Sequence, residues 1–70
     1  MTLLLHEKIG EVVNPSGIIV PNEEVLKKYG ITGIEVPDDI TDYSWDKYMR
    51  RLYYVVDGRI HVKHVERKRL

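Results

Sequence analysis

The alternation of apolar and polar positions is strongest in the last third of the chain. Residues 51–65 contain two β-branched and aromatic runs that flank Asp57 and Gly58. Because an Asp-Gly pair adopts the positive φ angles of a type I′ turn at little cost, this segment predicts a β-hairpin. The expected register pairs Val56 with Arg59, Val55 with Ile60, Tyr54 with His61, Tyr53 with Val62 and Leu52 with Lys63.

This register divides the hairpin into two faces, because neighbouring residues of a strand point to opposite sides. One face is wholly apolar, and we expect it to join the core: Val55, Ile60, Tyr53 and Val62. The other interleaves apolar side chains with basic ones: Val56, Tyr54, Leu52, Arg59, His61 and Lys63. We therefore expect a basic, aromatic outer face.

Shorter apolar runs predict a second hairpin near the start of the chain. Residues 9–13 indicate a strand or an extended segment. Residues 14–17, Asn-Pro-Ser-Gly, have the composition of a type I turn. This turn would connect to a strand at residues 18–20, which Pro21 would end.

A short helix is expected over residues 23–29. Asn22 is a favourable N-cap, and Gly30 is a favourable stop. Carboxylates occupy the first turn and lysines the last turn, as the helix dipole favours. The apolar stripe consists of Val25, Leu26 and Tyr29. Because so short a helix is unstable alone, it must pack on something.

A strand is expected next, at residues 31–36, with Ile34 and Val36 facing inward and Pro37 ending it. An acidic turn or loop follows at residues 38–42. We expect its carboxylates to be solvated rather than to perform acid–base chemistry.

Residues 45–52 allow two interpretations. Apolar side chains recur there at the spacing of one helix face: Trp45, Tyr48, Met49 and Leu52. This favours a helix of about two turns, capped by Ser44 or Asp42. The alternative is an extended chain from Tyr48 onward, because residues 53–56 are strongly β-prone.

Together the elements predict an α+β fold in one small domain, residues 1–70. We expect an antiparallel sheet built from two hairpins, with one or two short helices packed on one face, and a mobile basic tail at residues 66–70. A chain of 70 residues buries only about 60% of its surface on folding. It contains no cysteine for disulfides, so a partner or a second copy would help to stabilise it.

The zero net charge hides an asymmetry. Residues 1–44 carry three basic and eight acidic residues, a net charge of −5, and residues 45–70 carry eight basic and three acidic residues, a net charge of +5. Such separation can steer a charged partner or favour head-to-tail association, unless the two halves lie against each other and cancel.

The sequence offers little for catalysis. His61 and His64 would point to opposite faces of one strand, and with no cysteine present we expect neither a metal site nor a cofactor. His61 is expected to stack on Tyr54 instead. No phosphate-binding glycine loop occurs. Because the chain is small for a pocket of about 300 Å³, we expect no enzyme.

Three segments resemble a known group of proteins: residues 34–40 (IEVPDDI), 43–48 (YSWDKY) and 53–60 (YYVVDGRI). They are similar to small proteins, and to C-terminal segments of tail-fibre and baseplate proteins, of phages of Gram-positive bacteria. The match covers fewer than half of the residues, and residues 49–52 interrupt it. The resemblance implies a phage-related structural or accessory protein without catalytic residues.

Two functions remain as hypotheses. The first is a non-enzymatic protein-interaction module, an adaptor or inhibitor, because large aromatic residues often anchor interfaces. An acidic surface could also imitate a phosphate backbone. The interface candidates are Trp45, Tyr48, Tyr53, Tyr54, Asp38, Asp39 and Asp42. An exposed strand edge would permit a homodimer.

The alternative is nucleic-acid binding by the basic face of the hairpin, where cations contact phosphates and aromatic rings stack on bases. The candidates are Arg50, Arg51, Tyr54, Arg59, His61, Lys63, Arg67, Lys68 and Arg69. The near-neutral isoelectric point argues against it. No membrane partner is expected, because residues 3–5 are too short an apolar run to span a bilayer. We expect a cytoplasmic protein, in the host cell if phage-encoded.

Overall fold

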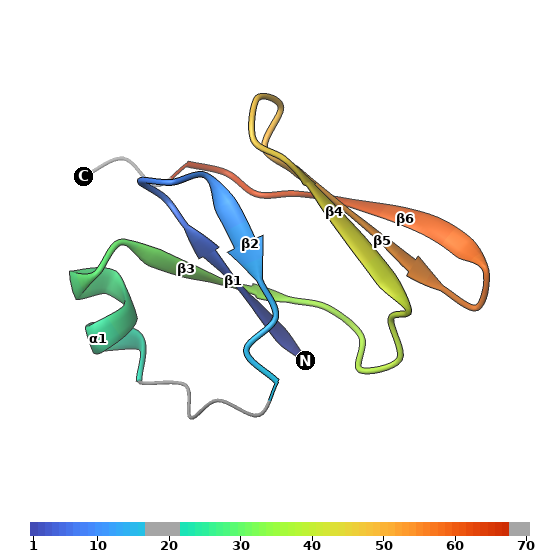
Figure 1. Ribbon diagram of the computed structural model, residues 1–70, viewed down its shortest axis with the longest axis horizontal. Helices are drawn as coiled ribbons and strands as arrows, with labels where there is room; N and C mark the ends of the chain where they lie inside the picture. Colours follow the sequence, from blue (N-terminus) through green and yellow to red (C-terminus); the bar gives the residue numbers. More distant parts are fainter. Residues whose placement is uncertain (17–21, 68–70) are drawn as a thin grey trace. The chain divides into compact units, whose positions relative to one another are not determined.

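The computed structural model describes residues 1–16 and 22–67. The chain divides into two compact units, Met1–Val36 and Pro37–Leu70. Each unit contains one three-stranded antiparallel sheet (Figure 1). The prediction of antiparallel hairpins with a short helix is confirmed in this coarse form. The strands nevertheless form two sheets rather than one, and the described residues are mostly β.

The first sheet has the strand order β2-β1-β3. Its strands are β1 (Thr2–His6), β2 (Glu11–Val13) and β3 (Ile31–Glu35). Alternate residues of β1 enter the core of this unit, where Leu3 and Leu5 are fully buried. Leu3 lies opposite Ile34 of β3, which is also buried. The alternation of β1 therefore fixes one apolar face of the sheet.

Helix α1 (Glu23–Lys28) packs against β3. The predicted cap is confirmed, because the Asn22 side chain accepts a hydrogen bond of 3.0 Å from the backbone N–H of Val25. Gly30 ends the helix with a φ of +72°, a conformation that costs glycine little. The predicted stripe is wrong at one position: Leu26 is buried, but Tyr29 is exposed.

The predicted strand at residues 31–36 is confirmed as β3, with Ile34 and Val36 buried. The structure shows a hairpin of β1 and β2 that the sequence patterning did not predict. The Asn14 side chain accepts from the N–H of Ser16, as in a turn. The strand predicted at residues 18–20 and the stop at Pro21 lie outside the described residues.

The second sheet has the strand order β4-β5-β6. Its strands are β4 (Asp42–Asp46), β5 (Arg51–Val56) and β6 (Arg59–His64). The predicted pairing of β5 with β6 is confirmed at every position. Asp57 and Gly58 have φ values of 52° and 73°, as both central residues of a type I′ turn require.

The predicted helix at residues 45–52 is wrong, and neither Ser44 nor Asp42 caps a helix, since both lie in β4. A four-residue turn, residues 47–50, connects β4 to β5. The Asp46 carboxylate holds the turn by accepting from the N–H groups of Tyr48 at 3.0 Å and Met49 at 3.2 Å. Arg50 then has a φ of 53°, which interrupts any right-handed helix. The alternative, an extended chain from Tyr48 onward, is confirmed only from Arg51, where β5 begins.

Both sheets begin with the same type of hairpin. Residues 7–10 connect β1 to β2, and residues 47–50 connect β4 to β5. In each case the last turn residue has a positive φ, 77° at Gly10 and 53° at Arg50. The two turns do not form a sequence repeat. Their shared left-handed position is occupied by glycine in one turn and by arginine, at a conformational cost, in the other.

The predicted faces of the last hairpin also need correction. Ile60 and Val62, expected in the core, are 76% and 58% exposed, whereas Leu52, expected outside, is fully buried. The third strand explains the difference. On the side of Leu52, β4 adds Tyr43 and Trp45, whereas on the side of Ile60 it adds short polar residues. Leu52 therefore shares its face with the larger side chains.

Candidate protein-interaction surface

Strand β6 forms an open edge of the second sheet. All six of its residues, Arg59–His64, are exposed. It pairs with β5 on one side, and no described strand pairs with its other side. An unpaired strand presents free N–H and C=O groups to which another chain can bond.

The turn geometry determines which backbone groups face outward. In an antiparallel pair, alternate residues bond to the partner strand. The type I′ turn makes Val56 and Arg59 a hydrogen-bonded pair, so every second residue of β6 from Arg59 onward bonds to β5. The last bond of this series is the one that the N–H of Val65 donates to the carbonyl of Arg50 at 2.9 Å. The N–H and C=O groups of Ile60, Val62 and His64 therefore face away from β5. We call these groups the outer edge of β6.

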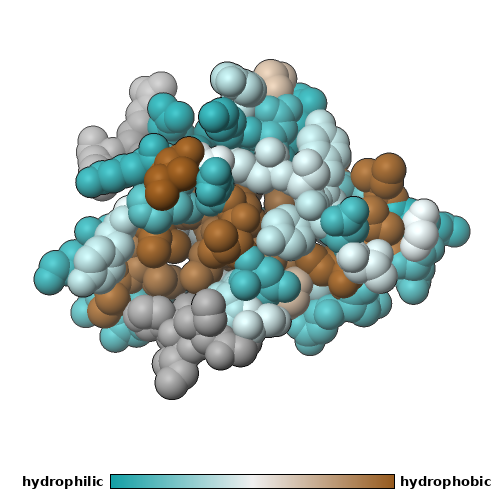
Figure 2. Space-filling view, viewed as in Figure 1, coloured by the Kyte–Doolittle hydropathy of each residue, from teal (hydrophilic) through white to brown (hydrophobic). Residues whose placement is uncertain are grey.

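Two apolar side chains accompany this outer edge. Ile60 and Val62 lie on one face of the sheet, which we call the Ile60 face, together with Tyr53 and Val55 of β5. Both Ile60 and Val62 are largely exposed, and hydrophobic side chains reach the surface among polar ones in Figure 2. Neither residue was among the interface candidates predicted from the sequence. The turn register could have identified their outward backbone groups but not the exposure of their side chains.

The opposite edge of this sheet, β4, is less open. By the same alternation, the N–H of Tyr43 faces away from β5. It donates at 2.8 Å to the side chain of Asp42. Acidic residues also stand at both ends of the strand, Asp42 and Asp46. Charges and occupied amides reduce pairing at an edge, so β6 is the more accessible side of this sheet.

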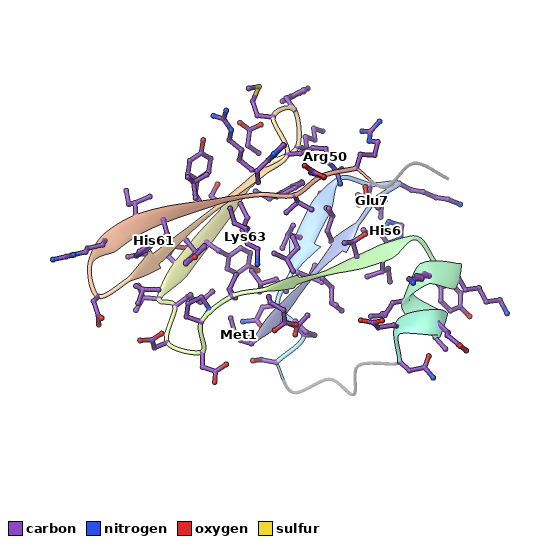
Figure 3. The ribbon with its side chains drawn as sticks, turned by 180° about the vertical axis from the view of Figure 1, so that it is seen from behind. Met1, His6, Glu7, Arg50, His61 and Lys63 are labelled. Atoms are coloured by element: carbon purple, nitrogen blue, oxygen red, sulfur yellow. The ribbon has the colours of Figure 1, made fainter. Side chains whose placement is uncertain are left out.

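The basic face of the hairpin is the side opposite to the Ile60 face, and β6 contributes Arg59, His61 and Lys63 to it. Figure 3 labels His61 and Lys63 on this strand. The predicted stacking is confirmed: the rings of Tyr54 and His61 are 5.4 Å apart between centroids and inclined by 12°. Four of the nucleic-acid candidates therefore share one face: the stacked pair Tyr54 and His61, with Arg59 and Lys63.

Of the remaining nucleic-acid candidates among the described residues, Arg50 lies beside a ring of this face, that of Trp45, whereas Arg51 lies on the other face. Arg51 lies opposite His64, on the Ile60 face. Arg50 donates from Nε to the carbonyl of Val65 at 3.0 Å, and its guanidinium lies 5.8 Å from the ring centre of Trp45. Arg67 is exposed. Lys68 and Arg69 lie outside the described residues.

The predicted aromatic anchors are also dispersed. Trp45 is half-buried on β4, with a buried Nε1 that has no hydrogen-bond partner among the described residues. Tyr53 and Tyr54 are neighbours on β5 and so point to opposite faces. Tyr48 is 87% exposed at the turn, with the Lys47 ammonium 5.6 Å from its ring centre.

The acidic candidates divide between two roles. Asp38 and Asp39 are exposed in the segment that precedes β4. Asp42 instead uses its carboxylate on the backbone of the next residue. The three therefore do not form one continuous acidic strip along a strand.

The first sheet contains a shallow hollow of about 160 Å³, lined by Leu4, His6, Ile9, Glu11, Val13 and Ile31. The Nδ1 atom of His6 is buried and has no hydrogen-bond partner in the described part of the chain. This volume is below the range of about 300–1,000 Å³ typical of small-molecule sites. The hollow is therefore a weaker candidate than β6.

His61 and His64 point to opposite faces of β6, as predicted. Within residues 1–16 and 22–67, no group of three or more His, Cys, Asp or Glu residues could hold a metal ion. No helix in this described part is long and apolar enough to cross a membrane.

No protein-family model matches the chain, and no curated protein or solved structure is significantly similar to it.

Proposed function

We propose that this protein is a non-enzymatic protein-interaction module that binds its partner through the second sheet. The observation that carries the proposal is β6, a strand with an open outer edge and six exposed residues. Addition of a partner strand to such an edge is a common mode of peptide recognition. Ile60 and Val62 would supply apolar contacts beside the backbone bonds.

The resemblance of residues 34–40, 43–48 and 53–60 to phage tail-fibre and baseplate segments supports a phage-related structural or accessory role. In that role the protein would act as an adaptor or as an inhibitor. A homodimer through β6 would use the same edge. The exposed Tyr48 at the turn offers a second contact point.

Site-specific photo-crosslinking tests the proposal. A benzophenone amino acid replaces Ile60 on β6, and the matched control places it at Glu24, which is exposed on α1. Both proteins are irradiated in a lysate of a Gram-positive bacterium. We expect a discrete protein adduct from position 60 that position 24 does not give. The same adducts from both positions, or none, would contradict the proposal.

Nucleic-acid binding is the second candidate, favoured by one observation. Arg59, His61 and Lys63 share a face with the ring of Tyr54. Such a face could contact phosphates and stack on a base. The double substitution Arg59→Ala and Lys63→Ala should then abolish binding of single-stranded oligonucleotides without unfolding the protein. Wild-type affinity should fall steeply with salt, and a flat salt response would count against this candidate.

A further inference from the structure

We propose that the partner of β6 is an extended acidic peptide segment, which adds to the outer edge as a fourth strand of the second sheet. This inference rests on the proposed function and names the chemistry of the partner. Strand addition needs a free row of backbone groups, and the outer edge supplies them at Ile60, Val62 and His64.

The charge of β6 selects an acidic occupant. The strand contains Arg59 and Lys63, two histidines and no acidic residue. A second copy of β6 would bring the same positive charges alongside, and like charges on adjacent strands are destabilising. A strand with alternating carboxylates would instead place opposite charges beside the basic face.

The two faces of β6 define the pattern of the peptide. Alternate side chains of an added strand lie on opposite faces of the sheet. Those on the Ile60 face meet the exposed Ile60 and Val62, so apolar side chains fit there. Those on the other face lie beside Arg59 and His61, where carboxylates fit. The recognised sequence therefore alternates acidic and β-branched residues.

The test uses a fluorescent peptide of alternating glutamate and valine, about six residues long to match the six residues of β6. Binding to the full chain is followed by fluorescence anisotropy and by the backbone amide signals of the protein. We expect the amide signals of Ile60, Val62 and His64 to shift most, because their outward N–H groups would donate the new hydrogen bonds to the peptide carbonyls. An alternating lysine–valine peptide should bind about tenfold more weakly or worse.

The matched variants are Val62→Pro and Val62→Thr. Proline removes an outward N–H that β5 does not use, a position where an edge strand tolerates it. Threonine retains the N–H and the β-branch. We expect Val62→Pro to weaken glutamate–valine peptide binding by about tenfold or more and Val62→Thr to have a much smaller effect. Equal binding by the two folded variants would overturn the inference.

A modified peptide keeps the test independent of how the proline variant folds. Methylation of every backbone nitrogen of the peptide leaves its side-chain charges but removes all of its backbone N–H donors, so binding should be lost. Retained binding would overturn strand addition. Amide shifts that arise with protein concentration alone would instead identify a second copy as the occupant. Tighter binding of an oligonucleotide at the same residues would identify nucleic acid.

These outcomes differ from failure of the proposed function. If the acidic peptide does not bind but position 60 still forms a discrete protein adduct, the peptide inference is wrong and the interaction module stands. If neither occurs, both are wrong.

Discussion

Leu52 and Ile60 provide the sharpest test of the fold of the second sheet. They are isomers, and they lie on opposite faces of the same hairpin. Sequence patterning places Ile60 in the core and Leu52 outside, whereas the structure shows Leu52 0% and Ile60 76% exposed. Truncation of each to alanine removes the same three carbons, so the two variants differ mainly in burial.

The exposed fractions determine the expected costs. A buried carbon contributes about 0.8 kcal/mol, so Leu52→Ala should lower the free energy of unfolding by about 2.4 kcal/mol, before any cavity term. Only about a quarter of Ile60 is buried, and Ile60→Ala should therefore cost about 0.6 kcal/mol through burial. Loss of β-propensity could add up to about 1 kcal/mol at Ile60.

Urea unfolding measures the difference. Trp45 is the single tryptophan of the chain and lies opposite Leu52 across β4 and β5, so its fluorescence reports on this sheet. The control Ile60→Thr retains the β-branch and separates propensity from burial. A larger loss for Ile60→Ala than for Leu52→Ala would refute the assignment of the two faces.

Three further substitutions test local features. Gly58→Ala should destabilise by about 1–2 kcal/mol through its φ of +73° alone, since an added Cβ meets nothing within 4 Å; an unchanged urea midpoint would contradict the type I′ turn. Asn22→Ala should cost about 1 kcal/mol in thermal unfolding followed by circular dichroism, while Asn22→Asp should cost little; equal losses would argue against the cap. Asp46→Ala removes an acceptor of two backbone bonds and should cost about 1–2 kcal/mol, whereas Asp46→Asn should retain most of the stability.

The last hairpin could be predicted because its specification is local. Asp57 and Gly58 select the turn, and the turn alone fixes which residues pair. The same holds for Asn22 and Gly30 at the ends of α1, where one side chain and one φ angle define each boundary. No distant contact had to be known at these positions.

The segment from Trp45 to Leu52 could not be predicted in this way. Its spacing imitates a helix face, but Trp45 and Leu52 are partners across two strands. Tyr48 and Met49 are exposed in the turn between them. A short turn between two strands can thus produce the same apolar intervals as two helical turns. The hydrogen bonds that the Asp46 carboxylate accepts favour the turn over the helix. The spacing of apolar residues carries no information about these bonds.

The candidate surface was predictable only in part. The shared face of Tyr54 and His61 follows from the register. The exposure of Ile60 does not, because it depends on which side chains β4 adds to each face. Long-range pairing decides such questions, and local patterning has no access to it.

The hydrogen bond from the Tyr43 amide to the Asp42 carboxylate limits how copies of this protein can assemble. An open-ended fibre built from the second sheet would need both edges, β6 of one molecule and β4 of the next. Because the Tyr43 amide already bonds to Asp42, a strand added at β4 would gain one backbone hydrogen bond fewer, which disfavours growth in that direction. Association through β6 should therefore end at a complex of defined size, which protects the protein from amyloid-like polymerisation while leaving one edge available.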